Sequence, residues 1–233
     1  MTFDTPLLLG TLIRRYKRFL ADVRLDDGTE ITVHCPNTGR MTTCAEPGWR
    51  VALSDSRNPK RKYRHTWELV HNGTCWICVN TNRANEVAAE AVTAGLFPEW
   101  GTACLREKTF GNSRFDLLLE NNGTRCYVEV KSVTLLADDG CYAFPDAVTQ
   151  RGRKHLEELV KVVQTGYRAA MLFVVLRSDG SGFRAAHEID PAYSNALTAA
   201  ISAGVEVQVW PAAVSLEGIV LVEPITTSYL PTI

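Results

Sequence analysis

The chain has 233 residues, of which 45% are hydrophobic and 22% charged, with a formal net charge of −1. This composition is typical of a globular protein and excludes a disordered or fibrous chain. No run of about 18 apolar residues occurs, so we expect no membrane-spanning helix. Residues 1–10 lack the basic start of a secretory signal, and the seven cysteines have no regular spacing. We therefore expect a cytoplasmic protein with reduced thiols and no membrane partner.

Basic residues are concentrated in the first third of the chain. Residues 1–80 contain 12 Lys and Arg against 8 Asp and Glu, whereas the remaining residues contain 13 against 18. A basic segment followed by an acidic one suits nucleic-acid binding by the first part and carboxylate chemistry in the second. An ordinary solvated surface explains so small an asymmetry nearly as well, so the charge distribution leaves both interpretations open.

The first 80 residues are expected to form short strands without a helix. Asp27-Gly28, Pro47-Gly48 and Asn72-Gly73 are turn dipeptides that separate apolar runs. Five or so strands in so short a segment predict a small barrel, with the OB-fold as the leading candidate. The candidate strands cover residues 7–14, 19–25, 29–34, 49–53, 66–70 and 74–79.

Two stretches of this predicted barrel combine basic residues with a tyrosine. Positive charge binds phosphates and aromatic rings stack on bases, so both stretches are candidates for binding single-stranded nucleic acid. The alternative for each stretch is an ordinary solvated surface. The first stretch comprises Arg14, Arg15, Tyr16, Lys17 and Arg18, and the second comprises Arg61, Lys62, Tyr63 and Arg64.

From residue 81 onward the pattern changes to α/β. The order helix, three strands, helix, strand, helix, strand predicts a sheet covered by helices on both faces. Residues 211–233 contain short apolar pieces that periodicity does not assign. The expected helices cover residues 84–94, 148–164 and 191–203, and the expected strands cover 104–109, the hairpin 113–131, 169–176 and 205–210.

Residues 113–131 contain the candidate site. Asn122-Gly123 is typical of a two-residue type I′ turn, and the apolar runs on either side of it predict a hairpin. Asn121 then faces Thr124, and each step away from the turn moves one residue back on the first strand and one residue forward on the second. Asp116 therefore faces Glu129. Because side chains alternate along a strand, Lys131 lies on the same side as both carboxylates. The other side is expected to be wholly apolar and consists of Phe115, Leu117, Leu119, Cys126, Val128 and Val130.

Asp116 and Glu129 are like charges on facing residues. Their Cβ atoms are expected roughly 5 Å apart, and certainly within the diagonal distance of about 7 Å, where like charges destabilise a sheet. One explanation is an ion-pair network with Arg114 and Lys131. The other is a divalent cation between the two carboxylates, with Lys131 beside it.

The order Asp116 followed by Glu129-x-Lys131 at the end of a strand resembles the catalytic signature of the PD-(D/E)XK nucleases. Phe115 stands where the family name has Pro. The resemblance implies that Asp116, Glu129 and the main-chain carbonyl of Val130 bind Mg²⁺ or Mn²⁺, which prefer oxygen ligands. It also implies that Lys131 orients the attacking water or stabilises charge on the phosphate.

Two predicted helices add charged side chains near this site. Glu90, with Glu86 as the less favoured choice, is the candidate for an outer-shell carboxylate from the first helix. Arg151, Lys154 and His155 place positive charge at the start of the second helix, where the helix dipole disfavours it. We therefore expect them to face an anion such as a DNA backbone, and we assign His155 no catalytic role. The nucleic-acid-binding candidates of this half are Arg114, Arg151 and Lys154.

Long strings spread over most of the chain resemble the bacterial sugar fermentation stimulation protein A family. The strings are LIRRYKRFLAD at 12–22, HCPNTG at 34–39, VNT at 79–81, YVEVKSVT at 127–134 and FPDAVT at 144–149, followed by Arg151-Gly152. The resemblance implies an OB-fold-like domain at 1–80 followed by a PD-(D/E)XK (restriction-endonuclease-like) α/β domain at 81–233. It also implies DNA binding and a link to the regulation of sugar (maltose) use.

Two hypotheses for function follow. In the first, the chain is a nuclease that depends on Mg²⁺ or Mn²⁺ and acts on single- or double-stranded DNA. In the second, it is a non-catalytic, DNA-binding transcriptional regulator that uses the nuclease-like domain as a scaffold. The complete set of Asp116, Glu129 and Lys131 favours the first, and the lack of a readable helix-turn-helix or zinc finger weakens a sequence-specific repressor.

Overall fold

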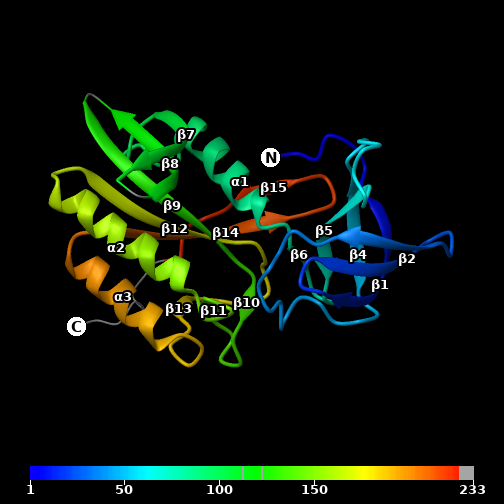
Figure 1. The fold of residues 1–233 in the computed structure, drawn as a ribbon. Helices are drawn as coiled ribbons and strands as arrows, with labels where there is room; N and C mark the ends of the chain where they lie inside the picture. The colour runs from blue at the N-terminus through cyan, green and yellow to red at the C-terminus, as the bar shows by residue number, and fades with distance from the viewer. Residues whose placement is uncertain (112, 122, 226–233) are drawn as a thin grey trace.

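The structure, a computed structural model, describes residues 1–111, 113–121 and 123–225. The chain forms two lobes that lie side by side, a β-barrel and an α/β domain (Figure 1). In the part of the chain that is described, no helix is both long and apolar enough to span a membrane.

The first lobe is a six-stranded antiparallel sheet that curls into a barrel. Its order is β3-β2-β1-β4-β5-β6, and an additional, parallel pairing of β3 with β5 closes it. Alternating apolar residues such as Leu12, Val23 and Val33 point inward and are buried together with Trp67. The predicted barrel is confirmed. Its strands are β1 (Leu8–Tyr16), β2 (Leu20–Leu25), β3 (Glu30–His34), β4 (Arg50–Asp55), β5 (His65–His71) and β6 (Trp76–Cys78).

The second lobe contains a mixed sheet in the order β15-β14-β12-β9-β8-β7 and a small sheet in the order β10-β11-β13. Strands β9, β12 and β14 are parallel, and the outer strands are antiparallel to their neighbours. The helices are α1 (Asn82–Thr93), α2 (Gln150–Gln164) and α3 (Pro191–Ser202). The strands are β7 (Ala103–Phe110), β8 (Ser113–Asn121), β9 (Thr124–Val133), β10 (Leu135–Leu136), β11 (Tyr142–Phe144), β12 (Arg168–Val175), β13 (Phe183–Ala185), β14 (Glu206–Val214) and β15 (Ile219–Leu221).

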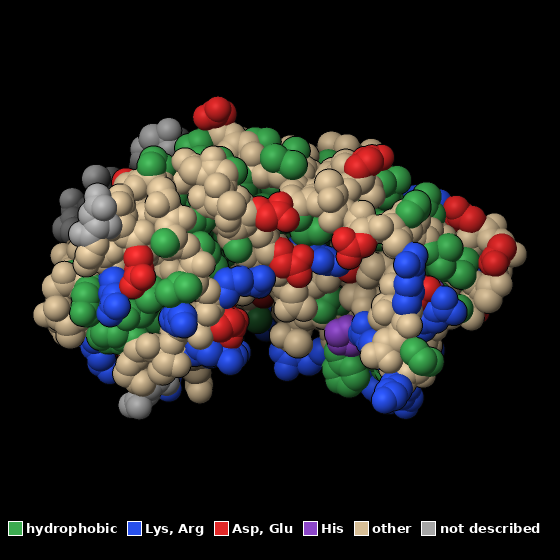
Figure 2. Space-filling model, turned by 90° about the horizontal axis from the view of Figure 1, so that it is seen from above, with side chains coloured by type: hydrophobic (Ala, Val, Ile, Leu, Met, Phe, Trp, Pro, Cys, Tyr) green, Lys and Arg blue, Asp and Glu red, His purple; other side chains and the backbone are tan. Residues whose placement is uncertain are grey.

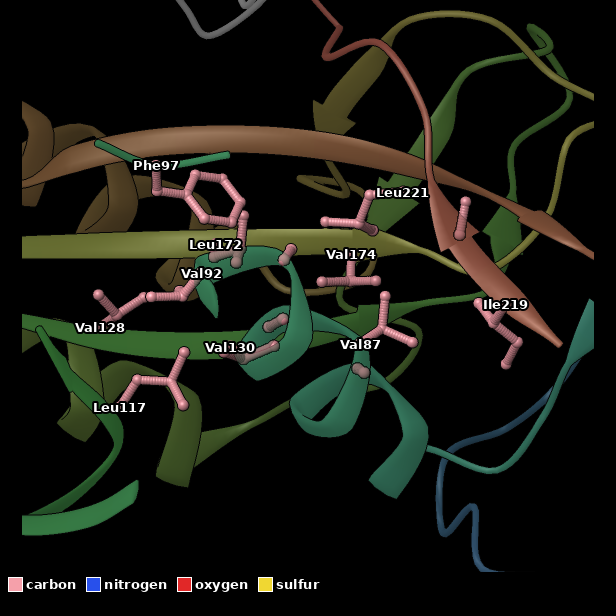
Figure 3. Packing of buried hydrophobic residues seen from close by; sticks show 14 of the residues in the cluster. Val87, Val92, Phe97, Leu117, Val128, Val130, Leu172, Val174, Ile219 and Leu221 are labelled. Atoms are coloured by element: carbon pink, nitrogen blue, oxygen red, sulfur yellow. The ribbon is translucent and has the colours of Figure 1, made fainter. Parts of the chain in front are cut away.

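The helices cover the two faces of the mixed sheet, as the alternation of elements predicts. Helix α1 packs on one face, where Val92 lies near Val128 and Leu172, and Val87 lies near Val174 (Figure 3). Helices α2 and α3 pack on the other face, in a separate apolar cluster that includes Met171. Because β9 and β12 are central, consecutive residues of both strands are buried on opposite faces. A polar side chain on β9 is therefore enclosed unless it lies near the end of the strand.

The hairpin β8–β9 has the predicted register from Leu117–Val128 to Asn121–Thr124. Asn122 lies outside the described residues, and Gly123 has a φ of +84°, as the second residue of such a turn requires. The pairing ends at Leu117, one step before Asp116.

One part of the hairpin prediction is wrong, because Phe115 does not share the α1 face with Leu117. It packs instead in the α2–α3 cluster, with its ring centroid 5.8 Å from that of Tyr127. The paired strand β7 is irregular at this point, since Glu107 adopts a left-handed φ of +57° and the ladder passes from Leu117 directly to Phe115. This irregularity changes the alternation of β8 around Asp116.

Polar contacts join the barrel to the α/β domain. Arg177 Nη1 donates to Thr43 Oγ1 of the barrel (2.8 Å) and to the Thr134 carbonyl after β9 (2.6 Å). Gly39 approaches Asp146 so closely that a Cβ atom at this position would lie 2.2 Å from Asp146 Oδ2. A barrel segment around residues 37–43 is thereby docked beside the end of β9.

Candidate functional site

Glu129 is the centre of a buried polar cluster on the α2 face of β9. Only 3% of the residue is exposed. Its Oε1 accepts a hydrogen bond from Lys131 Nζ (2.6 Å) and is in contact with His155 Nδ1 of α2. Its Oε2 is buried and has no hydrogen-bond partner among the described residues. One carboxylate oxygen is therefore fixed by two protein groups, and the other is left without a partner.

Asp116 lies next to this cluster and is half-buried. Its Oδ1 accepts from Asn85 Nδ2 of α1, and its Oδ2 accepts from the Val130 amide, each at 2.8 Å. The Val130 amide of β9 thereby has an acceptor in a region where the β8–β9 ladder has already ended. Direct opposition of Asp116 and Glu129 stays a prediction, because their pair is one step beyond the last pair of the ladder.

The two carboxyl groups have pKa values that are shifted in opposite directions. Burial, together with the charge of Glu129, raises the pKa of Asp116 despite the hydrogen bonds from Val130 and Asn85. Burial also acts to raise the pKa of Glu129, but the hydrogen bond from His155 and the charge of Lys131 outweigh it, so that pKa is lowered. Glu129 is therefore the carboxylate that stays ionised more readily of the two.

A polar cavity of about 480 Å³ opens in front of these residues, between the two lobes. Thr38 and Gly39 of the barrel form one wall, and Gly152 and Arg151 at the start of α2 form another. The face drawn in Figure 2 is hollowed between the two halves of the molecule, and Lys and Arg side chains gather beside the hollow. The other charged or amide residues that line the cavity are Arg18, Asn37, Asn82, Asn85, Asp116, Glu129, Lys131, Asp146 and His155.

The donor atoms around the cavity fit a hard divalent cation that keeps most of its water ligands. In the described ranges, no group of three or more His, Cys, Asp or Glu side chains is arranged to hold a metal ion. The unpartnered Oε2 of Glu129 is a buried acceptor, however, and a second carboxylate, Asp116, lines the same cavity. Two carboxylates and a backbone carbonyl are sufficient protein ligands for an ion such as Mg²⁺.

Two family models match the chain. The model described as the SfsA N-terminal OB domain matches residues 13–79, and that described as the sugar fermentation stimulation protein RE domain matches residues 82–218. The chain belongs to the sugar fermentation stimulation protein family. The fold class predicted from the sequence is thereby confirmed: an OB-fold-like barrel precedes a restriction-endonuclease-like (PD-(D/E)XK) α/β domain.

Members of the sugar fermentation stimulation protein family align with the chain over most of its length. The homolog of Thioalkalivibrio sulfidiphilus is 49% identical, and the alignment covers 96% of this chain and 98% of that protein. The homolog of Aeromonas salmonicida is 55% identical, with coverages of 89% and 87%. The structure of Pyrococcus furiosus SfsA in complex with Ca²⁺ superposes with a TM-score of 0.87 at 26% identity, covering 97% of this chain and 96% of that one.

The structure places Glu90 away from Asp116, contrary to the outer-shell position expected from the sequence. Its side chain is 60% exposed, and its carboxylate pairs with the amino group of Met1 at 2.7 Å. Residues five apart on a helix lie about 140° apart around its axis, so Glu90 and Asn85 point in different directions. Asn85, an amide, occupies the position that we expected a carboxylate to fill. Glu86 is paired with Arg83.

The first basic stretch divides into structural and surface residues. Arg15 braces the barrel, because its guanidinium donates to the carbonyls of Arg18, Asn37 and Gly39 at 2.7–2.9 Å. Its guanidinium thus bonds to carbonyls of the barrel itself, and contact of Arg15 with nucleic acid stays a prediction. Arg18 itself lines the cavity. Lys17 is exposed, Arg14 pairs with Asp22 at 2.9 Å, and the hydroxyl of Tyr16 donates to Asp22 at 3.0 Å.

The second basic stretch lies on the barrel surface. Arg64 forms a two-pronged pair with Asp55, in which Nη2 lies 2.5 Å from Oδ2. Lys62 extends over the ring of Tyr63, with Nζ 5.5 Å from the centroid, and forms no ion pair within the described residues. Arg61 donates to Thr66 Oγ1 at 3.3 Å. This stretch therefore contains one neutralised cation and one cation–aromatic pair that is accessible to a ligand.

The α/β candidates differ in their relation to the cavity. Arg151 lines the cavity and donates to His155 Nε2 at 3.5 Å. Lys154 is exposed but does not line the cavity. Arg114 is paired with Glu107 at 2.7 Å on the surface of the β7–β8 hairpin.

Sequence reasoning missed two residues that contact the carboxylates, His155 and Asn85. His155 belongs to the buried stripe of α2, which follows helical spacing through residues 152, 155, 156, 159 and 162. Counting polar residues as well as apolar ones at the helical spacing would have identified His155. Asn85 is half-buried on α1, and no pattern in the sequence relates it to Asp116, which is 31 residues away.

Proposed function

We propose that this protein is a DNA-binding phosphodiesterase that uses Mg²⁺ or Mn²⁺ held by Asp116, Glu129 and the carbonyl of Val130. The observation that carries the proposal is Glu129 Oε2, a buried carboxylate oxygen without a partner in the described part of the chain, on a residue that lines the polar cavity. A buried acceptor without a donor is costly, and a cation would satisfy it. The Ca²⁺ in the related Pyrococcus furiosus structure supports the proposal, because Ca²⁺ also selects oxygen ligands.

The side chains around the cavity suit the hydrolysis of a phosphodiester. A bound divalent ion would lower the pKa of a water ligand and polarise the scissile phosphate. Lys131 Nζ is held 2.6 Å from Glu129 Oε1, and only 15% of its side chain is exposed. Its positive charge is therefore fixed beside the proposed metal-binding carboxylate. From there it would stabilise negative charge that develops on phosphate oxygens. Arg18 and Arg151, which line the cavity from the two lobes, would bind flanking phosphates.

DNA is the substrate class that the rest of the surface supports. Lys17, Arg18 and Lys62 are among the barrel cations that form no ion pair with a described carboxylate, and Arg151 lines the same cavity as Arg18 from the other lobe. Phosphate contacts of this kind bind without regard to sequence. We propose that the protein acts in the cytoplasm and that its binding to DNA connects it to the regulation of sugar (maltose) metabolism.

Three variants test the chemistry: Asp116→Asn, Glu129→Gln and Lys131→Met, assayed with Mn²⁺ on labelled single- and double-stranded DNA. Each should reduce cleavage by at least about 100-fold, as the loss of one preorganised charged group does in other enzymes. Glu90→Gln is the matched control, because it removes a carboxylate of α1 outside the cavity, and it should cleave like wild type. Cleavage that persists in all three variants would come from a contaminant and would refute the proposed site.

The second candidate is a non-catalytic, DNA-binding transcriptional regulator. It is favoured by the hydrogen bonds to Asp116, both of whose oxygens already accept from protein groups. If wild type binds DNA but does not cleave it with Mg²⁺ or Mn²⁺, this second candidate is correct.

A further inference from the structure

His155 is the only histidine in contact with the carboxylates, among the residues that the structure describes. It lies in the second turn of α2 and is 8% exposed. Its Nδ1 is in contact with Glu129 Oε1, and Lys131 Nζ lies 3.4 Å from the same nitrogen. Its Nε2 faces Arg151 Nε at 3.5 Å. The imidazole therefore lies between a side chain that lines the cavity and the carboxylate at its base.

The partners of the ring determine where its proton lies. Arginine is a donor and has no acceptor, so Arg151 Nε–H can only donate to Nε2. Lys131 Nζ is likewise only a donor, and it donates to Glu129 Oε1 rather than to Nδ1. With Nε2 as the acceptor, the ring carries its hydrogen on Nδ1. That hydrogen points at Glu129 Oε1, so His155 donates to the oxygen that Lys131 also contacts. Two donors on Oε1 leave Oε2 as the oxygen without a partner.

We infer that His155 is a positioning residue that fixes the rotation of the Glu129 carboxylate and so keeps Oε2 available to a divalent cation. The inference rests on the proposed function, in which Glu129 is a metal ligand. Groups that form a hydrogen bond to a metal-binding side chain orient that side chain. Losing such a group typically lowers metal affinity about 10- to 100-fold. His155 touches neither the reacting phosphate nor the ion in this scheme and acts only through Glu129.

Two conservative substitutions separate this role from simple packing in the α2 stripe. The side-chain amide nitrogen of Asn can occupy the place of Nδ1, whereas that of Gln can occupy the place of Nε2. His155→Asn therefore retains a donor toward Glu129, and His155→Gln retains only a polar atom on the Arg151 side. His155→Leu fills much of the volume without either group. If His155 only fills space, the larger Gln and Leu should preserve Mn²⁺ affinity better than Asn. If His155 acts as a hydrogen-bond donor, Asn should preserve the affinity better than Gln and Leu.

The experiment is a calorimetric titration of the full chain with Mn²⁺, with the melting temperature of each variant measured alongside. His155→Leu and His155→Gln should bind Mn²⁺ roughly 10- to 100-fold more weakly than wild type, and His155→Asn should recover most of the loss. Equal affinity in wild type and His155→Leu, or a loss that is the same for Asn and Gln, would overturn the inference. If His155→Leu does not fold, the comparison of Asn with Gln decides the matter.

Glu129→Gln distinguishes failure of this inference from failure of the proposed function. If Glu129→Gln abolishes Mn²⁺ binding while the His155 variants bind like wild type, only the positioning role is refuted. If wild type binds no Mn²⁺, or binds it no better than Glu129→Gln, both the proposed metal site and the role of His155 are refuted.

Discussion

Replacing Arg177 with Met should strongly destabilise the protein, because this arginine is a buried connection between the two lobes. Only 1% of it is exposed. It donates to Asp179 through Nε (2.6 Å) and Nη2 (2.7 Å), and Nη1 reaches Thr43 Oγ1 and the Thr134 carbonyl. Methionine fills similar space but leaves the Asp179 carboxylate with one remaining side-chain donor, Asn72.

The expected cost follows from the burial of the pair. Removing one partner of a buried ion pair typically destabilises a protein by about 3–5 kcal/mol, because the other charge stays buried without compensation. For a chain of this length, the same loss lowers the melting temperature by roughly 6–20 °C. Urea denaturation followed by circular dichroism measures the free energy of unfolding directly. Arg184→Met is the matched control, since Arg184 pairs with exposed Asp139 and Glu188 and should contribute less than about 1 kcal/mol.

A double-mutant cycle isolates the interaction itself. If Arg177 and Asp179 stabilise each other, Arg177→Met combined with Asp179→Asn should cost less than the sum of the single changes, by about 1–3 kcal/mol. A loss in Arg177→Met no larger than in the Arg184→Met control would refute the reasoning. Strict additivity in the cycle would show that the pair is not the source of the stability.

Two further predictions use pH and salt. The hydrogen bonds from Arg177 lower the pKa of Asp179 to about 2. Because this pKa lies below the unfolded value of about 3.9, Asp179 contributes stability above about pH 4 that is lost as the pH falls toward 2. Between pH 5 and pH 2, the free energy of unfolding should therefore fall by roughly 1–2 kcal/mol more in wild type than in Asp179→Asn, and parallel curves would contradict this. In fluorescence anisotropy, Lys62→Ala should weaken DNA binding and reduce the salt slope by about 1, whereas Arg64→Ala, whose charge Asp55 neutralises, should change both less. Equal effects of the two substitutions would show that the Arg64–Asp55 ion pair opens when DNA binds.

The candidate site was predictable to the extent that it depends on the hairpin. The Asn-Gly dipeptide and the alternation of apolar residues predict the register that joins Leu117 to Val128, which brings Asp116 close to Glu129 and Lys131. The same alternation is wrong at Phe115, because it cannot anticipate that Glu107 on the neighbouring strand adopts a left-handed conformation. Glu90 lies next to the apolar stripe of α1, which favours it from the sequence, but the direction of a helix face relative to a distant strand is decided by packing.

The sequence by itself determined the order of the three helices and of the longer strands, the barrel followed by an α/β domain, and the pairing of β8 with β9. It did not predict the short strands β10, β11, β13 and β15. The features that it determined depend on patterns within a few turns or strand lengths, where spacing along the chain reports directly on which side a residue faces. The tertiary structure alone decided that His155 contacts Glu129, that Asn85 binds Asp116, and that the barrel forms one wall of the cavity. Arg177 and Thr43, which are 134 residues apart, hold that wall in place. Contacts between residues so distant leave no periodic pattern in the sequence, because they depend on how completed lobes pack against each other.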